Sequence, residues 1–171
     1  MSQPLPKTDS ELLAFLSATP AKIARLLSGL ADEELRTRTS PELFSTLENV
    51  CHLRDLELQG YSKRIDRILK ETEPALADFD GARVAAEGNY NREVLSEALE
   101  AFQSARNENV QKLRGLTDAE LLRVGLLEGV GRITLPMLAE MMREHDEGHL
   151  EDLRVLRQQL DRQGADHVTP V

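Results

Sequence analysis

The last third of the chain carries an apolar stripe at helical spacing, and two histidines interrupt it. Leucine and methionine recur at steps of three or four residues between positions 135 and 160, which places them on one face of an α-helix. His145 and His149 fill a gap in the middle of that face. The pattern therefore predicts a long amphipathic helix, capped by Thr134 and running to about Arg162, whose two histidines point into the protein.

Inward-pointing imidazoles one turn apart need a partner. They repel each other when both are protonated, and each costs desolvation energy when it is buried alone. A divalent metal ion removes both problems, because neutral imidazole is a good ligand for zinc, nickel or iron. A third histidine, His52, lies at the edge of the apolar stripe of an earlier helix, and periodicity alone does not place it inside. The fourth, His167, is expected to be a solvated residue of the tail. Because such spacing also arises by chance, purely structural histidines stay open as an alternative.

The composition favours helices throughout. Of the 171 residues, 40% are hydrophobic and 30% are charged, which is typical of a soluble globular protein with one core. Leucine, alanine, glutamate and arginine dominate, whereas isoleucine, tyrosine and phenylalanine are sparse, and no segment shows the alternation that strands require. We therefore predict an all-α fold in a single domain that spans residues 1–171.

Capping residues and apolar spacing delimit the other helices. Ser40 followed by Pro41 predicts the start of a second long helix, which extends to about Lys70 and has Leu43 and Leu58 in its apolar stripe. The connection that follows is too long for a tight hairpin, so we expect a crossover to the third helix. The remaining predictions are a short helix begun by Thr8, a new helix capped by Thr19 ahead of Pro20, short turns over 31–38 and 117–120, a helix over 91–115, and a glycine-rich loop over 124–131.

The charge balance argues against some classes of function. The formal net charge is −9, and an acidic surface repels phosphate backbones, so we do not expect nucleic-acid binding. No apolar run approaches the length that spans a bilayer, and the N-terminus has no basic and apolar signal, so we expect no membrane partner. Cys51 is the only cysteine, and we expect it to be a core thiol of a cytoplasmic protein without an internal disulfide.

Two short motifs carry a resemblance to a known family. One motif consists of Phe-Ser-Thr-Leu-Glu at 44–48 followed by His-Leu-Arg-Asp-Leu-Glu at 52–57, and the other is His-Asp-Glu-Gly-His-Leu at 145–150. They are similar to the second-helix and last-helix motifs of the DinB/YfiT-like superfamily of metalloenzymes, and 131–135 resembles the turn before the last helix. The likeness covers about residues 19–157. Where this chain has Phe44 the family often has tryptophan, which affects packing more than metal binding.

The resemblance implies both a fold and a site. The fold is an all-α four-helix bundle with a crossover connection, and His52, His145 and His149 are expected to bind a divalent metal ion, with water completing the shell. The implied function is that of a metal-dependent enzyme that catalyses thiol transfer or hydrolysis. Its candidate partners are a small-molecule substrate, such as a low-molecular-weight thiol, and a second copy of the chain in a homodimer.

Two other functions stay open at this point. One is a non-enzymatic metal-binding or stress-response protein, and the other is a helical interaction module with structural histidines. The sequence names no catalytic residue beyond the candidate ligands. Asp55, almost one turn after His52, either accepts a hydrogen bond from it or is a surface acid, which we favour. Glu48 is also expected to be solvated. Tyr90 and Arg106 are candidates to line a pocket or to support the fold.

Overall fold

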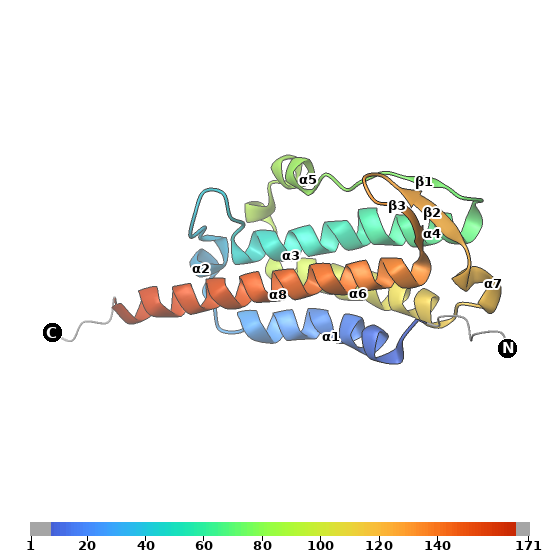
Figure 1. The fold of residues 1–171 in the computed structure, drawn as a ribbon. Helices are drawn as coiled ribbons and strands as arrows, with labels where there is room; N and C mark the ends of the chain where they lie inside the picture. The colour runs from blue at the N-terminus through green and yellow to red at the C-terminus, as the bar shows by residue number, and fades with distance from the viewer. Residues whose placement is uncertain (1–7, 167–171) are drawn as a thin grey trace.

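A computed structural model describes residues 8–166, and its long helices form a bundle (Figure 1). The second long helix consists of three consecutive pieces, the middle one a π-helical turn. The bundle is built from α1 (Ser10–Leu27), α3 (Thr46–Asp55), η1 (Leu56–Tyr61), α4 (Ser62–Lys70), α6 (Leu95–Arg114) and α8 (Leu135–Asp166). The shorter helices are α2 (Asp32–Arg36), α5 (Gly81–Gly88), η2 (Tyr90–Arg92) and α7 (Asp118–Leu121).

The helices follow a bundle topology with one long crossover. Helices α1 and α3 each pack against both α6 and α8, so α1 and α3 occupy opposite corners of the bundle. Helices α3 and α6 run in the same direction in Figure 1, and the connection between them returns along the length of the bundle. The predicted all-α four-helix bundle and its crossover are therefore confirmed.

Helix α1 is continuous where the sequence predicted two helices. Thr19 does not cap a new helix, because its hydroxyl donates a hydrogen bond back to the carbonyl of Phe15 at 3.1 Å. Pro20 lies inside the helix and has no N–H to offer to the carbonyl of Leu16. Arg106 of α6 donates to that carbonyl at 3.1 Å instead. A contact from a distant part of the chain thus satisfies the acceptor that the proline leaves free.

The second long helix starts later than predicted and changes its periodicity. Ser45, and not Ser40, is the N-cap, and it forms a capping box with Glu48. The π-helical turn η1 then rotates the side chains that follow relative to an α-helix. As a result, Leu43 lies outside the helix and Leu58 faces solvent, so their predicted burial was wrong.

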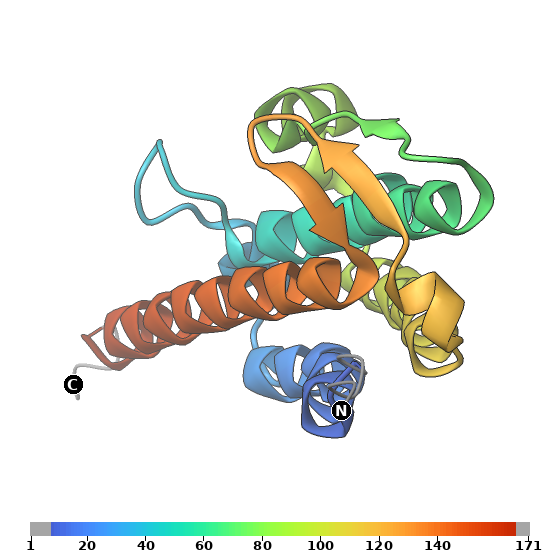
Figure 2. The same ribbon diagram turned by 45° about the vertical axis from the view of Figure 1, so that its right-hand side comes forward.

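A small sheet replaces the loop that was predicted over 124–131. Strand β2 (Val124–Leu127) pairs antiparallel with β3 (Gly131–Thr134) and parallel with β1 (Ala75–Leu76), in the order β1-β2-β3. Figure 2 shows the hairpin lying over the α4 side of the bundle. Gly125 permits this close approach, since a Cβ there would lie 2.6 Å from the Leu76 side chain. Strands this short give no readable alternation.

Two apolar clusters fill the bundle, one after the other along its axis. On α8 the first cluster ends at Met142 and the second begins at Leu150, and on the second long helix they meet between Leu53 and Leu56. The candidate histidines fall at this boundary. Thr134 caps α8 through the N–H of Met137, as predicted. Among the described residues, no helix is both long and apolar enough to cross a membrane.

Candidate metal centre

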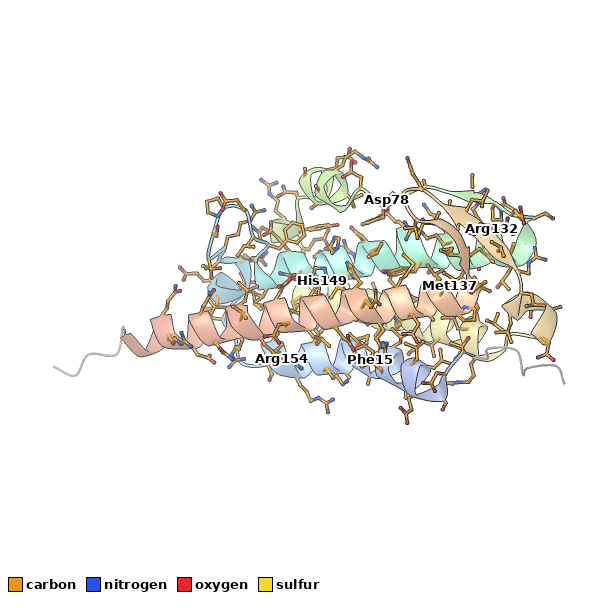
Figure 3. The ribbon with its side chains drawn as sticks, viewed as in Figure 1. Phe15, Asp78, Arg132, Met137, His149 and Arg154 are labelled. Carbon is orange, nitrogen blue, oxygen red and sulfur yellow. The ribbon has the colours of Figure 1, made fainter. Side chains whose placement is uncertain are left out.

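The three predicted histidines meet in space. His52 lies on α3, and His145 and His149 lie on α8. Figure 3 shows His149 on the side of α8 that is turned toward α3. The Nε2 atoms of His52 and His145 are 3.4 Å apart, and one nitrogen of each of the three rings lies within 4.8 Å of the others. Among the described side chains, these three form the only group of three or more histidine, cysteine or acidic residues whose ligand atoms lie close enough together to share a metal ion. Periodicity alone left the side of His52 open, and in the structure its ring lies beside the pair, while metal binding by the three residues stays a prediction.

The donor set fits a divalent ion. With zinc–nitrogen distances of about 2.0–2.1 Å and tetrahedral angles, two ligand nitrogens lie about 3.3–3.4 Å apart. The Nε2 atoms of His52 and His145 already have that separation. Three nitrogen ligands leave one tetrahedral position for a substrate or water, as catalytic sites require.

Burial keeps the imidazoles in the form that binds metal. It lowers the pKa of His52 to about 4, with a further contribution from His149, although Asp55 opposes the shift. Burial also lowers the pKa of His145 to about 3, with contributions from His149, His52 and Arg106. The pKa of His149 is lowered by burial too, against the charges of Asp152 and Asp146. All three rings are therefore neutral near pH 7 and have a lone pair to donate.

Asn49 fixes the orientation of His149. The amide nitrogen of Asn49 donates to the backbone carbonyls of Ser45 at 2.9 Å and Phe44 at 3.4 Å, so its oxygen must face His149. That oxygen lies 2.8 Å from the Nδ1 of His149, which is consequently the protonated nitrogen. The lone pair of His149 is then on Nε2. The sequence analysis missed Asn49; its position one turn before His52 on the same helix was the available signal.

Packing holds His52 in place. Its ring centre lies 5.6 Å from that of Phe44 and 6.0 Å from that of Phe79, with tilted planes in both cases. Gly81, at the start of α5, also lies against the His52 ring. A Cβ on Gly81 would lie 2.6 Å from the Cε1 atom of His52, so only glycine fits beside this ring orientation.

The two acids near His52 are not solvated, contrary to the prediction. Asp55 is buried and accepts hydrogen bonds from the hydroxyl of Tyr90 and the Nε of Arg54, each at 2.8 Å. The Nδ1 of His52 has no hydrogen-bond partner, so Asp55 does not orient it either. Glu48 is buried and paired with Arg38. Both acids are paired with arginines, Glu48 with Arg38 and Asp55 with Arg54, and they support the surroundings of α3.

The other candidate residues that the structure describes are buried within the fold. Cys51 is fully buried, and burial raises the pKa of its thiol to about 12, so it is a core thiol as predicted. Tyr90 and Arg106 are both buried and do not line the pocket described below. His167 lies outside the described residues.

Arg106 belongs to a buried charged cluster at the same level of the bundle. Its guanidinium donates to both oxygens of Asp146, at 2.5 and 3.0 Å, and to Glu57 of η1 at 2.8 Å. Asn109 donates to the other oxygen of Glu57 at 2.8 Å. This cluster, which we call the Arg106 cluster, links α6, α8 and the π-helical turn.

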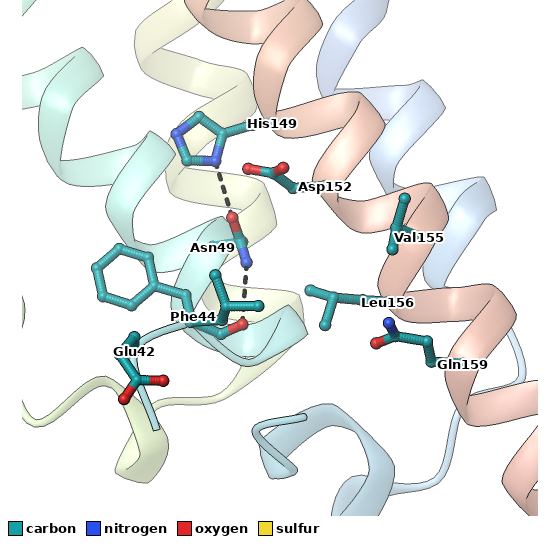
Figure 4. Close-up of a pocket in the computed structure, with 9 residues that line it drawn as sticks. Glu42, Phe44, Asn49, His149, Asp152, Val155, Leu156 and Gln159 are labelled. Carbon is teal, nitrogen blue, oxygen red and sulfur yellow. Dashed lines mark hydrogen bonds between the residues drawn. The ribbon is translucent and has the colours of Figure 1, made fainter. Parts of the chain in front are cut away.

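A pocket of about 280 Å³ adjoins the histidines (Figure 4). His149 and Asn49 form one end of it, and the segment that precedes α3 and the following turns of α8 form its sides. The full lining consists of Glu42, Leu43, Phe44, Asn49, His149, Asp152, Val155, Leu156 and Gln159. A small molecule in this pocket would lie next to one of the three candidate ligands.

Comparisons with known proteins agree with this fold. A solved structure of similar fold is YfiT from Bacillus subtilis, described as a probable metal-dependent hydrolase with an unusual four-helix bundle topology. It superposes with a TM-score of 0.78 over 96% of this chain and 94% of that chain, at 21% sequence identity, which establishes the likeness of fold. No curated protein matches the sequence. A family model of the DinB superfamily matches residues 16–153, which is most of the chain. The chain therefore belongs to the DinB superfamily.

Proposed function

We propose that His52, His145 and His149 bind one divalent metal ion, and that the protein is a metal-dependent hydrolase. The observation that carries the proposal is the convergence of three neutral imidazoles, with the His52 and His145 Nε2 atoms 3.4 Å apart. The description of YfiT as a probable metal-dependent hydrolase favours hydrolysis over thiol transfer. When bound, a zinc, nickel or iron ion would supply a Lewis acid that polarises a substrate oxygen and activates water.

The residues of the chain set the conditions for that chemistry. Burial keeps the rings neutral, and the Asn49 oxygen holds the His149 proton on Nδ1, so that Nε2 is the donor. Phe44 and Phe79 pack near the His52 ring and restrict its orientation. Cys51 is buried with a raised pKa, so it does not serve as a nucleophile. We therefore assign the role of nucleophile to water.

Metal analysis and a reaction screen test this proposal. Protein purified without a histidine tag should contain, or take up, about one divalent ion per chain. The loaded protein should hydrolyse members of a panel of esters and amides, whereas metal-free protein and the His145→Ala variant should not. A control panel offers electrophiles together with a low-molecular-weight thiol.

Each outcome has a definite meaning. Conjugation without hydrolysis would replace the hydrolase by a thiol transferase at the same centre. Stoichiometric metal without activity in either panel would favour the non-enzymatic metal-binding protein. Failure to load any divalent ion at pH 7.5 would overturn the proposal and leave the histidines as structural residues.

A further inference from the structure

The pocket next to His149 has an apolar body. Two large hydrophobic residues in its lining leave much of their side chains exposed: Leu43 is 54% exposed and Val155 is 44% exposed. Phe44 and Leu156 add further apolar surface. Concave apolar surface of this size beside a few polar groups is typical of small-molecule sites.

The charged side chains of the pocket are acidic, and its amide groups belong to Asn49 and Gln159. Glu42 and Asp152 contribute carboxylates, and the lining includes no lysine or arginine. The Oε1 atom of Gln159 is buried and has no hydrogen-bond partner in the protein. The side-chain amide of Asn49 is already committed to His149 and to backbone carbonyls. The pocket therefore offers acceptors and negative charge to a ligand and retains no free cationic donor of its own.

We infer that this pocket binds the substrate of the proposed metal centre, and that the substrate is a small molecule with an apolar body and an ammonium group. This inference rests on the proposed function, because His149 belongs to both sites. In the metal-free protein an ammonium ion is favoured by the two carboxylates, while a carboxylate or phosphate would be repelled. The acidic net charge of −9 acts in the same sense at longer range.

Three probes with the same chain test the inference: hexylamine, hexanol and hexanoate. Their binding to metal-free protein is measured by isothermal titration calorimetry at pH 7, so that no amine can coordinate a metal ion. Hexylamine should bind most tightly and hexanoate most weakly. Equal affinities, or tighter binding of hexanoate, would overturn the inference.

Matched variants separate the charged from the apolar contribution. Asp152→Asn should weaken hexylamine about two- to fivefold, the range for a solvent-exposed charge pair, and leave hexanol unchanged. Leu43→Ser should weaken all three probes alike. Leu122→Ser, at an apolar residue that is 59% exposed and lies outside the pocket, should change none of them.

Metal loading is measured separately on the same preparations. If the metal binds but the order of the probes is not as expected, the pocket inference fails and the proposed function stands. If the probes bind in the expected order but no divalent ion binds, the proposed function fails, and the pocket is a binding site for amines without the metal chemistry.

Discussion

Two polar clusters lie at the same level of the bundle, and they differ in whether their hydrogen-bond acceptors have partners within the protein. His145 and Asp146 are neighbours on α8, so their side chains point about 100° apart around the helix. Asp146 joins the Arg106 cluster, in which both carboxylates bond to protein donors and the three charged side chains are at most 1% exposed. His145 joins His52 and His149, where the Nδ1 atoms of His52 and His145 have no partner and the ligand nitrogens face one another.

The difference separates a structural cluster from a ligand site. In the Arg106 cluster all four carboxylate oxygens accept hydrogen bonds within the protein, and the single arginine lies between the two acids, with its Nε left without a partner. Burial by itself lowers the pKa of Arg106, but Glu57 and Asp146 more than offset it, so the group stays charged. Among the histidines the charges of nearby acids oppose the effect of burial only in part, and the rings are kept neutral with free lone pairs. Neutral imidazoles with free lone pairs are the form in which histidines bind a divalent cation.

Removing the centre of the Arg106 cluster should have the largest effect on stability. Arg106→Met leaves Glu57 and Asp146 buried as unpaired acids and the Leu16 carbonyl without its donor. We expect a loss of about 3–5 kcal/mol in the free energy of unfolding, measured by urea denaturation. Arg154→Met, at an exposed arginine paired with Glu151, should change it by no more than about 0.5 kcal/mol. Similar losses in the two variants would contradict the structural role.

Changes in the histidine cluster should remove metal and spare the fold. In metal-free protein, His149→Ala should leave the thermal unfolding curve close to that of the parent, because apolar neighbours still bury α8. It should bind no stoichiometric metal. Leu153→Ala should do the reverse, losing about 2–5 kcal/mol while the folded fraction keeps its metal.

The comparison between these two variants is made on metal-free protein, since bound metal adds stability of its own. Circular dichroism reports unfolding, and metal content is measured on the same samples. Retention of metal by His149→Ala would show that this ring is not a ligand.

Asn49 should matter for metal affinity through its oxygen alone. Asn49→Ala removes the acceptor that orients His149, and we expect metal affinity to fall about 10- to 100-fold. Asn49→Asp keeps an acceptor at the same place and should retain most of the affinity, although it loses the bonds to the Ser45 and Phe44 carbonyls. A competition titration with a chelating dye measures both. Equal losses would mean that Asn49 acts by supporting the start of α3.

The last expected effect is a pH dependence of the metal-free protein. The pKa values of His52 and His145, about 4 and about 3, lie below the ordinary value of 6.5 that they regain on unfolding. Between pH 6.5 and 4 the unfolded chain therefore binds protons that the folded protein does not, and stability must fall as the pH falls. Urea denaturation at pH 7, 6 and 5 should show this. The double variant His52→Gln/His145→Gln should have a flatter profile, and an unchanged slope would assign the dependence to other groups.

Local patterns in the sequence determined much of this protein. The apolar stripe over 135–160 predicted α8 and its inward-facing histidines, and Thr134 was correctly predicted as its cap. These features are readable because an α-helix relates residues three and four apart, so the relevant neighbours are close in the sequence. The motifs around His52 and His145 also indicated the family that the comparisons show.

The tertiary structure decided the features that depend on partners far apart in the chain. Pro20 stays inside α1 because Arg106, 86 positions later, bonds to the freed carbonyl of Leu16. The short sheet forms because β1 of the crossover pairs with β2, about 50 residues later in the sequence. Asn49 acquires its role from His149 across the bundle. In each case a polar group without a partner in its own element is paired with a group from a distant part of the chain. Helical or strand periodicity in the sequence does not indicate such a pairing, because it relates only neighbouring residues.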